Sequence, residues 1–166
     1  MSNPKIKIVV KDFGEMTAEL YPDKAPKTVE NFLGLVKSGF YSGLIFHRVI
    51  SGFMIQGGGY NESFGETDAP AIKGEFAANG FMQNDLKHSR GVLSMARTNN
   101  PNSASSQFFI CQDDDGVAHL DGNYAAFGTV LQGMDTVDKI AAAQTNSSDI
   151  PLQTIVITSI KFVTID

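Results

Sequence analysis

The sequence predicts a mainly β protein of about eight strands and two helices, and three observations support this. Most of its apolar stretches alternate with polar residues at a period of two, which is typical of strands with one buried face. These stretches are widely spaced and do not alternate regularly with helices, so a parallel sheet is not indicated. The chain has 16 glycines, as expected for many turns, and its 166 residues suit one domain, residues 1–166, with a single core.

Two strands and a helix are expected at the start of the chain. Alternating apolar residues predict strands over 6–10 and 16–20, and the turn sequence at 12–14 joins them as a hairpin. A helix over about 27–38 follows, because apolar residues recur there with the three- and four-residue spacing of one helix face. Pro26 suits the first position of that helix, where its missing N–H is not needed.

The remaining sequence predicts more strands, a second helix and one long connection. Further strands are expected over 44–50, 53–57, 91–96, 107–111, 125–131 and 154–163. Apolar residues at 134, 137, 140 and 141 indicate the second helix. Residues 58–88 are rich in glycine and polar residues and predict irregular connections, with one short strand near 72–76. The pattern is compatible with a barrel that has a helix at each open end, and also with a sandwich.

Composition and charge argue against several classes of protein. The formal net charge of −5 disfavours nucleic-acid binding, because such proteins usually present a basic face. No stretch approaches ~18 consecutive apolar residues and the first ten residues lack the pattern of an export signal, so we expect a cytoplasmic protein that does not enter a membrane. Cys111 is the only cysteine, so it forms no internal disulfide, and its position at the end of an apolar run favours a buried, inert thiol.

Residues 41–58 alternate like strands yet contain His47, Arg48 and Gln56 among apolar and β-branched residues. Burying an arginine in such surroundings costs several kcal/mol unless its donors are used. We therefore expect Arg48 to point into a cleft where a bound group accepts hydrogen bonds from it. If the strands over 44–50 and 53–57 form a hairpin or bend, Gln56 lies near Arg48.

Two segments resemble the signatures of the cyclophilins, the family of peptidyl-prolyl cis/trans isomerases. Residues 41–58 read Tyr-Ser-Gly-Leu-Ile-Phe-His-Arg-Val-Ile-Ser-Gly-Phe-Met-Ile-Gln-Gly-Gly, and residues 106–110 read Ser-Gln-Phe-Phe-Ile. The resemblance implies a closed eight-stranded antiparallel β-barrel capped by two α-helices. It also implies a monomeric isomerase that acts on X-Pro bonds in peptides and unfolded protein chains, assists protein folding and uses no cofactor or metal.

Isomerisation of a prolyl bond requires rotation against a barrier of ~18–20 kcal/mol, and no bond is broken. A donor aimed at the prolyl nitrogen helps, because the nitrogen lone pair becomes an acceptor only when the bond twists. The resemblance places the catalytic arginine of the family at Arg48, and Gln56 could orient that arginine or hold the substrate backbone. The substrate-binding positions that it implies are Phe53, Met54, Ala96, Arg97, Thr98, Gln107, Phe109, His119, Leu120 and Tyr124.

Four features depart from the familiar eukaryotic members of the family. His119 stands where those proteins have a tryptophan, and Tyr124 stands where they often have a histidine. Arg97 replaces the commoner asparagine, and the interval over 95–107 is one residue longer. Because the tryptophan resembles a platform for cyclosporin, we expect this chain to bind cyclosporin weakly.

Other functions remain as alternatives. A peptide-binding or chaperone module could use the same groove without turnover, although such a module does not need an arginine that faces the prolyl nitrogen. A hydrolase would need a nucleophile and a base, and no motif supplies them. The three histidines, at 47, 88 and 119, lack the spacing of metal ligands, and we expect His47 to be either a core histidine with its hydrogen bonds satisfied or a histidine that supports a site residue.

Overall fold

The computed structural model describes residues 3–67 and 69–163. Within these ranges the chain forms eight strands, two α-helices and two single turns of 3₁₀-helix. In chain order they are β1 (Lys5–Val10), β2 (Gly14–Leu20), α1 (Pro26–Lys37), β3 (Arg48–Ile50), β4 (Met54–Gly57), the 3₁₀ turn Ala77–Asn79, β5 (Val92–Met95), β6 (Phe108–Cys111), the 3₁₀ turn Ala118–Leu120, β7 (Ala126–Gln132), α2 (Met134–Ala141) and β8 (Ile157–Phe162).

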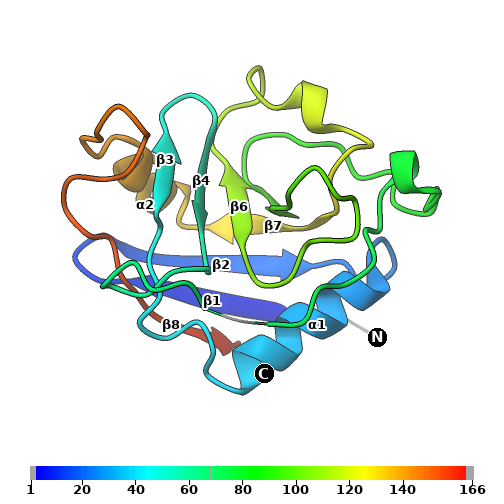
Figure 1. The fold of residues 1–166 in the computed structure, drawn as a ribbon, viewed down its shortest axis with the longest axis horizontal. Helices are drawn as coiled ribbons and strands as arrows, with labels where there is room; N and C mark the ends of the chain where they lie inside the picture. The colour runs from blue at the N-terminus through cyan, green and yellow to red at the C-terminus, as the bar shows by residue number, and fades with distance from the viewer. Residues whose placement is uncertain (1–2, 68, 164–166) are drawn as a thin grey trace.

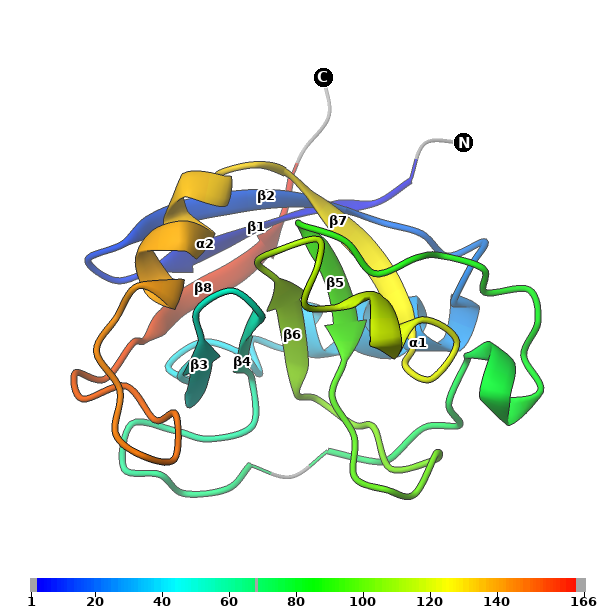
Figure 2. The same cartoon turned by 90° about the horizontal axis from the view of Figure 1, so that it is seen from above.

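The strands form one antiparallel sheet in the order β3-β4-β6-β5-β7-β2-β1-β8. Figures 1 and 2 show the sheet curling into a half-barrel, with α1 against β8 and α2 beside β2 and the β3–β4 hairpin. The prediction of eight antiparallel strands with two helices is therefore confirmed.

Closure of the barrel is not confirmed, because β3 and β8 end the sheet and do not pair as strands. The chain before β3 instead meets the start of β8 at an isolated bridge. There the N–H groups of Gly43 and Phe46 donate to the carbonyls of Ile157 and Ile155 at 2.8 and 2.9 Å, and the N–H of Ile157 donates to the carbonyl of Leu44 at 2.7 Å. At β3 itself, the N–H of Val49 instead donates to the carbonyl of Asp149 at 2.9 Å. A loop thus occupies the outer edge of β3, and the sheet stays open there.

Several predicted strands are shorter in the structure. Of the strand predicted over 44–50, only β3 forms in the structure, because Leu44 and Ile45 bridge to two different segments of the chain. The terminal strand begins at Ile157, three residues later than predicted. Near 72–76 there is a single bridge between Ile72 and Ala104 in place of a strand. In each case the apolar pattern correctly indicated burial, but the hydrogen bonds do not form a ladder.

Apolar side chains divide into two buried clusters. The larger cluster fills the inside of the curled sheet against α1, where the ring of Phe32 lies within 5.0–5.5 Å of the rings of Tyr41, Phe108 and Phe127. The smaller cluster consists of Met54, Val92, Phe109, Cys111, Val117, Leu120 and Ala126. This second cluster supports the surface on which the candidate site lies.

The N-terminus of α1 is capped by a residue from the long connection between β4 and β5. Ala25 precedes the helix and offers no side-chain acceptor, and Pro26 has no N–H. Glu75 supplies the acceptors: Oε1 accepts from the N–H and the hydroxyl of Thr28 at 2.6 and 2.7 Å, and Oε2 accepts from the N–H of Lys27 at 3.2 Å. The long connection is therefore fixed to the helix.

Candidate active site

The β3–β4 hairpin carries the two polar residues that the sequence singles out. Arg48 and Gln56 are register partners, so the prediction that they lie near each other is confirmed. Arg48 is exposed on the edge strand, so it is not buried among apolar residues as the sequence had suggested. Within the described ranges its guanidinium group makes no ion pair or hydrogen bond, and it borders a pocket.

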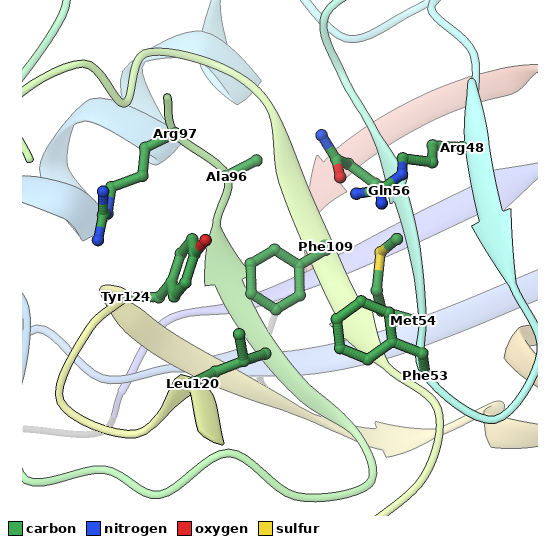
Figure 3. A pocket seen from close by; sticks show the side chains of 9 residues that line it. All are labelled: Arg48, Phe53, Met54, Gln56, Ala96, Arg97, Phe109, Leu120 and Tyr124. Carbon is green, nitrogen blue, oxygen red and sulfur yellow. The ribbon is translucent and has the colours of Figure 1, made fainter. Parts of the chain in front are cut away.

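The pocket has a volume of about 130 Å³ and an apolar floor with a polar rim. Nine residues line it, as Figure 3 shows: Arg48, Phe53, Met54, Gln56, Ala96, Arg97, Phe109, Leu120 and Tyr124. Met54, Phe109 and Leu120 are almost fully buried and belong to the smaller core cluster. The ring of Tyr124 meets Phe109 edge to face, with centroids 5.8 Å apart. The pocket can therefore hold a small apolar ring beside a free guanidinium group.

A second hollow of about 200 Å³ adjoins the pocket and is mostly polar. Its lining residues are Gln56, Glu66, Ala96, Arg97, Thr98, Ser103, Ser105 and Gln107. Gln56 lies between the two hollows, and its Nε2–H donates to Oε1 of Gln107 at 2.9 Å. This bond fixes the amide of Gln56 on the strand next to Arg48.

Arg97 is held firmly in the wall between the two hollows. Its guanidinium carbon lies 4.9 Å from the ring centre of Phe76 and 4.7 Å from that of Tyr124. Its Nε–H and Nη2–H donate to the carbonyl of Asn123 at 3.1 and 2.7 Å, and Nη1–H donates to the carbonyl of Thr98 at 2.9 Å. The positive charge of Arg97 is thus used by neighbouring rings and carbonyls, in contrast to that of Arg48.

Eleven of the twelve predicted site residues therefore line one of two adjoining hollows. His119 is the exception. It is exposed and lies outside both linings, but its ring stacks on Phe53 with centroids 5.9 Å apart and an angle of 21° between the ring planes. His119 consequently contacts the site through a lining residue.

A buried polar group that the sequence analysis missed supports the pocket floor. The ring of His88 stacks on Phe109 at 6.0 Å, its Nδ1 lies 3.1 Å from Oδ1 of Asp121, and its Nε2 lies 2.8 Å from Oγ of Ser94. Burial lowers the pKa of His88, so the ring is neutral near pH 7. Because a carboxylate only accepts, Nδ1–H donates to Asp121 and the Ser94 hydroxyl donates to Nε2. No sequence spacing reveals this contact.

Two other sequence expectations have different outcomes. His47 is half-buried, its Nδ1 is buried with no hydrogen-bond partner among the described residues, and burial lowers its pKa to about 4. The expectation that its hydrogen bonds are satisfied is therefore wrong. Cys111 is buried, as expected, and burial raises the pKa of its thiol to about 12.

Among the residues that the structure describes, no three His, Cys, Asp or Glu side chains gather in a way that could hold a metal ion. The same residues include no helix with the length and apolar character needed to cross a membrane.

Comparisons with known proteins agree with this geometry. The family model described as cyclophilin type peptidyl-prolyl cis-trans isomerase/CLD matches residues 5–162. A peptidyl-prolyl cis-trans isomerase of Acinetobacter baylyi is 46% identical over 164 residues, which cover 93% of this chain and 84% of the relative. Peptidyl-prolyl cis-trans isomerase B of Escherichia coli is 43% identical over 159 residues, covering 89% of this chain and 93% of the relative.

Solved structures show the same fold. A cyclophilin type isomerase of Cryptosporidium parvum matches with a TM-score of 0.83 and 30% identity over 99% of both chains. Another crystal structure of that protein, obtained in the presence of the dipeptide Ala-Pro, matches with a TM-score of 0.80 and 30% identity over 96% of this chain and 99% of the other. The chain therefore belongs to the cyclophilin-type peptidyl-prolyl cis-trans isomerases, and it is an isomerase.

Proposed function

We propose that the pocket binds the proline of an X-Pro segment and that Arg48 stabilises the prolyl nitrogen while the bond is twisted. The observation that carries this proposal is the position of Arg48, whose guanidinium group borders an apolar pocket and has no hydrogen-bond or ion-pair partner within residues 3–67 and 69–163. The relative that was crystallised in the presence of Ala-Pro supports a proline peptide as the ligand.

In this proposal, the proline ring rests against Phe53, Met54, Phe109 and Leu120 while the acyl side of the bond rotates. Twisting removes the nitrogen lone pair from conjugation, so a donor at that nitrogen stabilises the transition state more than either ground state. Arg48 is suited to this role because its guanidinium group is permanently charged and rigid, and no neighbour in the described part of the chain competes for its donors. Gln56, held by Gln107, is placed to contact the substrate backbone.

The segment from Ala96 to Thr98, in the wall of the cleft, is proposed to hold the main chain of the substrate. The N–H of Ala96 already donates to the carbonyl of Gln107 at 3.0 Å. Because hydrogen bonds and rings hold the side chain of Arg97, the segment from Ala96 to Thr98 presents a fixed backbone to the cleft. We expect this segment to bind the substrate main chain, so the replacement of asparagine by Arg97 is compatible with activity.

The test is a protease-coupled isomerisation assay on a proline tetrapeptide. Arg48→Ala should lower kcat/KM about 10²- to 10³-fold, the usual cost of losing one transition-state donor. Arg48→Lys should restore little, since an ammonium group lacks the planar fork. Lys161→Ala, an exposed cation on β8, is the control and should keep wild-type activity. Near-normal activity of folded Arg48→Ala would refute the role of Arg48.

We also propose the oligomeric state, the location and the substrates of the protein. We expect one domain that acts as a cytoplasmic monomer on proline-containing peptides and unfolded chains. The single buried cysteine is compatible with a reducing compartment. Light scattering of the purified protein and fractionation of the source cells test these points.

A further inference from the structure

The β3–β4 hairpin carries Arg48 and Phe53, yet its strands give it little support. β3 has three residues and lies at the edge of the sheet, where β4 is its one strand partner among the described strands. The turn between the strands is exposed at Ser51 and Gly52. Besides the pairing with β4 and the bond from the Val49 N–H to the Asp149 carbonyl, the position of Arg48 depends on what holds this turn.

Gln112, which follows β6, holds the turn through both its side chain and its backbone. Its Oε1 accepts from the N–H of Gly52 at 2.6 Å, and its own N–H donates to the carbonyl of Phe53 at 2.9 Å. The following loop also lies close to the turn, since a Cβ at Gly116 would be 2.6 Å from the carbonyl oxygen of Gly52. Gln112 thus forms hydrogen bonds with two successive residues of the turn, Gly52 and Phe53.

Gln112 is also bonded to the ion pair between Asp138 on α2 and Arg90, which precedes β5. Its side-chain Nε2–H donates to Oδ1 of Asp138 at 3.1 Å, and its backbone carbonyl accepts from Nη1 of Arg90 at 2.8 Å. Arg90 and Asp138 pair through two bonds of 2.7 Å each. The orientation of the amide is unambiguous, because only oxygen can face the Gly52 N–H and only NH₂ can face a carboxylate.

We propose that Gln112 is a positioning residue for the isomerase, which connects the β3–β4 turn to the Arg90–Asp138 pair and so sets the position of Arg48 at the proline pocket. This inference rests on the proposed role of Arg48. The floor residues Met54 and Phe109 are held by the core and do not depend on Gln112. Loss of Gln112 therefore affects the twisted state, which uses Arg48, more than the binding of the proline ring.

The experiment compares Gln112→Met with Gln132→Met in the isomerisation assay. Methionine matches glutamine in length but makes neither bond, whereas Gln132 is exposed at the far end of β7. Gln112→Met should lower kcat about tenfold, less than the ~10²-fold cost of a full 1 Å misplacement, with KM within about twofold of wild type. Gln132→Met should leave both constants unchanged. Gln112→Glu, which keeps the acceptor for Gly52 but faces Asp138 with a second carboxylate, should show the same loss of kcat.

Combining the substitution with Arg48→Ala separates positioning from a general effect on the fold. If Gln112 acts through Arg48, Gln112→Met lowers the residual activity of Arg48→Ala by less than about twofold, because coupled residues are not additive. A tenfold loss in both backgrounds, or a wild-type kcat for Gln112→Met and Gln112→Glu, would overturn the inference while the role of Arg48 stands. Full activity of Arg48→Ala would instead refute the proposed function itself.

Discussion

Glu75 lies outside both hollows, and its substitution should nevertheless cost the protein much of its stability. Oε1 of its carboxylate accepts from the N–H and hydroxyl of Thr28, which are fully buried, whereas the Lys27 N–H that contacts Oε2 belongs to an exposed residue. Glu75→Ala therefore leaves two buried donors unpaired. At about 1–3 kcal/mol for each buried unpaired group, the expected loss is about 4 kcal/mol. For a chain of this size that corresponds to a fall in Tm of roughly 8–16 °C.

The conservative substitution should cost less. Glu75→Gln keeps one oxygen for Thr28 but removes the negative charge from the N-terminus of α1 and turns an NH₂ group toward the N–H of Lys27. A loss of about 2 kcal/mol, or roughly 4–8 °C in Tm, is expected. Glu30→Gln, the same change at an exposed position of α1, is the matched control and should stay within about 0.5 kcal/mol of wild type.

Calorimetry or thermal circular dichroism on the three variants measures these differences. If Glu75→Ala melted within about 1 °C of wild type, the Thr28 donors would have another partner and the capping argument would be refuted.

Three further predictions concern pH and inhibition. Activity should vary little between about pH 7 and about pH 8, because burial lowers the pKa of His47 to about 4 and also lowers that of His88 from its usual value, so both rings are neutral there. Activity should also survive EDTA, because the proposed step uses no metal; loss of turnover in EDTA with recovery in zinc would contradict this. The pKa of His47 is about 6.5 in the unfolded chain and about 4 in the folded one, so the free energy of unfolding should fall as the pH drops from about 6.5 toward 4. His47→Phe should reduce this pH dependence of the free energy of unfolding, measured by urea unfolding at several pH values. Cyclosporin should inhibit weakly, because the imidazole of His119 covers less apolar area than an indole. His119→Trp should bind cyclosporin more tightly, and equal affinities in the two proteins would show that His119 does not set the response.

The central part of the site could be predicted because it depends on local geometry. Arg48 and Gln56 are equally distant from Gly52, so a hairpin with its turn at 51–53 must place them opposite each other. Alternation at a period of two then directs both side chains to one face. The signature segments add the apolar residues of the floor, and the structure brings them to the same pocket.

Closure of the sheet and the extent of the strands could not be predicted in the same way. Residues 44–46 are buried and apolar, which is what the alternating pattern detects. Their backbone groups, however, bond in turn to the segments around Tyr60 and Ile155, which are far apart in the sequence. Apolar periodicity reports burial, whereas a closed barrel requires a continuous ladder between two particular strands, and such a ladder depends on contacts distant in the chain.

The residues that support the site could not be predicted from the sequence either, because they lie in the connection between β4 and β5, where the sequence predicts irregular structure. In the connection between β4 and β5, Glu75 caps α1, and the next residue, Phe76, lies against Arg97 in the wall of the cleft. Asn84 donates to the carbonyls of Glu75 and Ala126, both at 2.9 Å, and so fixes this pair to β7. A displacement of Glu75 would therefore move Phe76 and loosen Arg97. The helix cap and the cleft wall share one irregular segment, so substitutions at Glu75 should change substrate binding as well as stability.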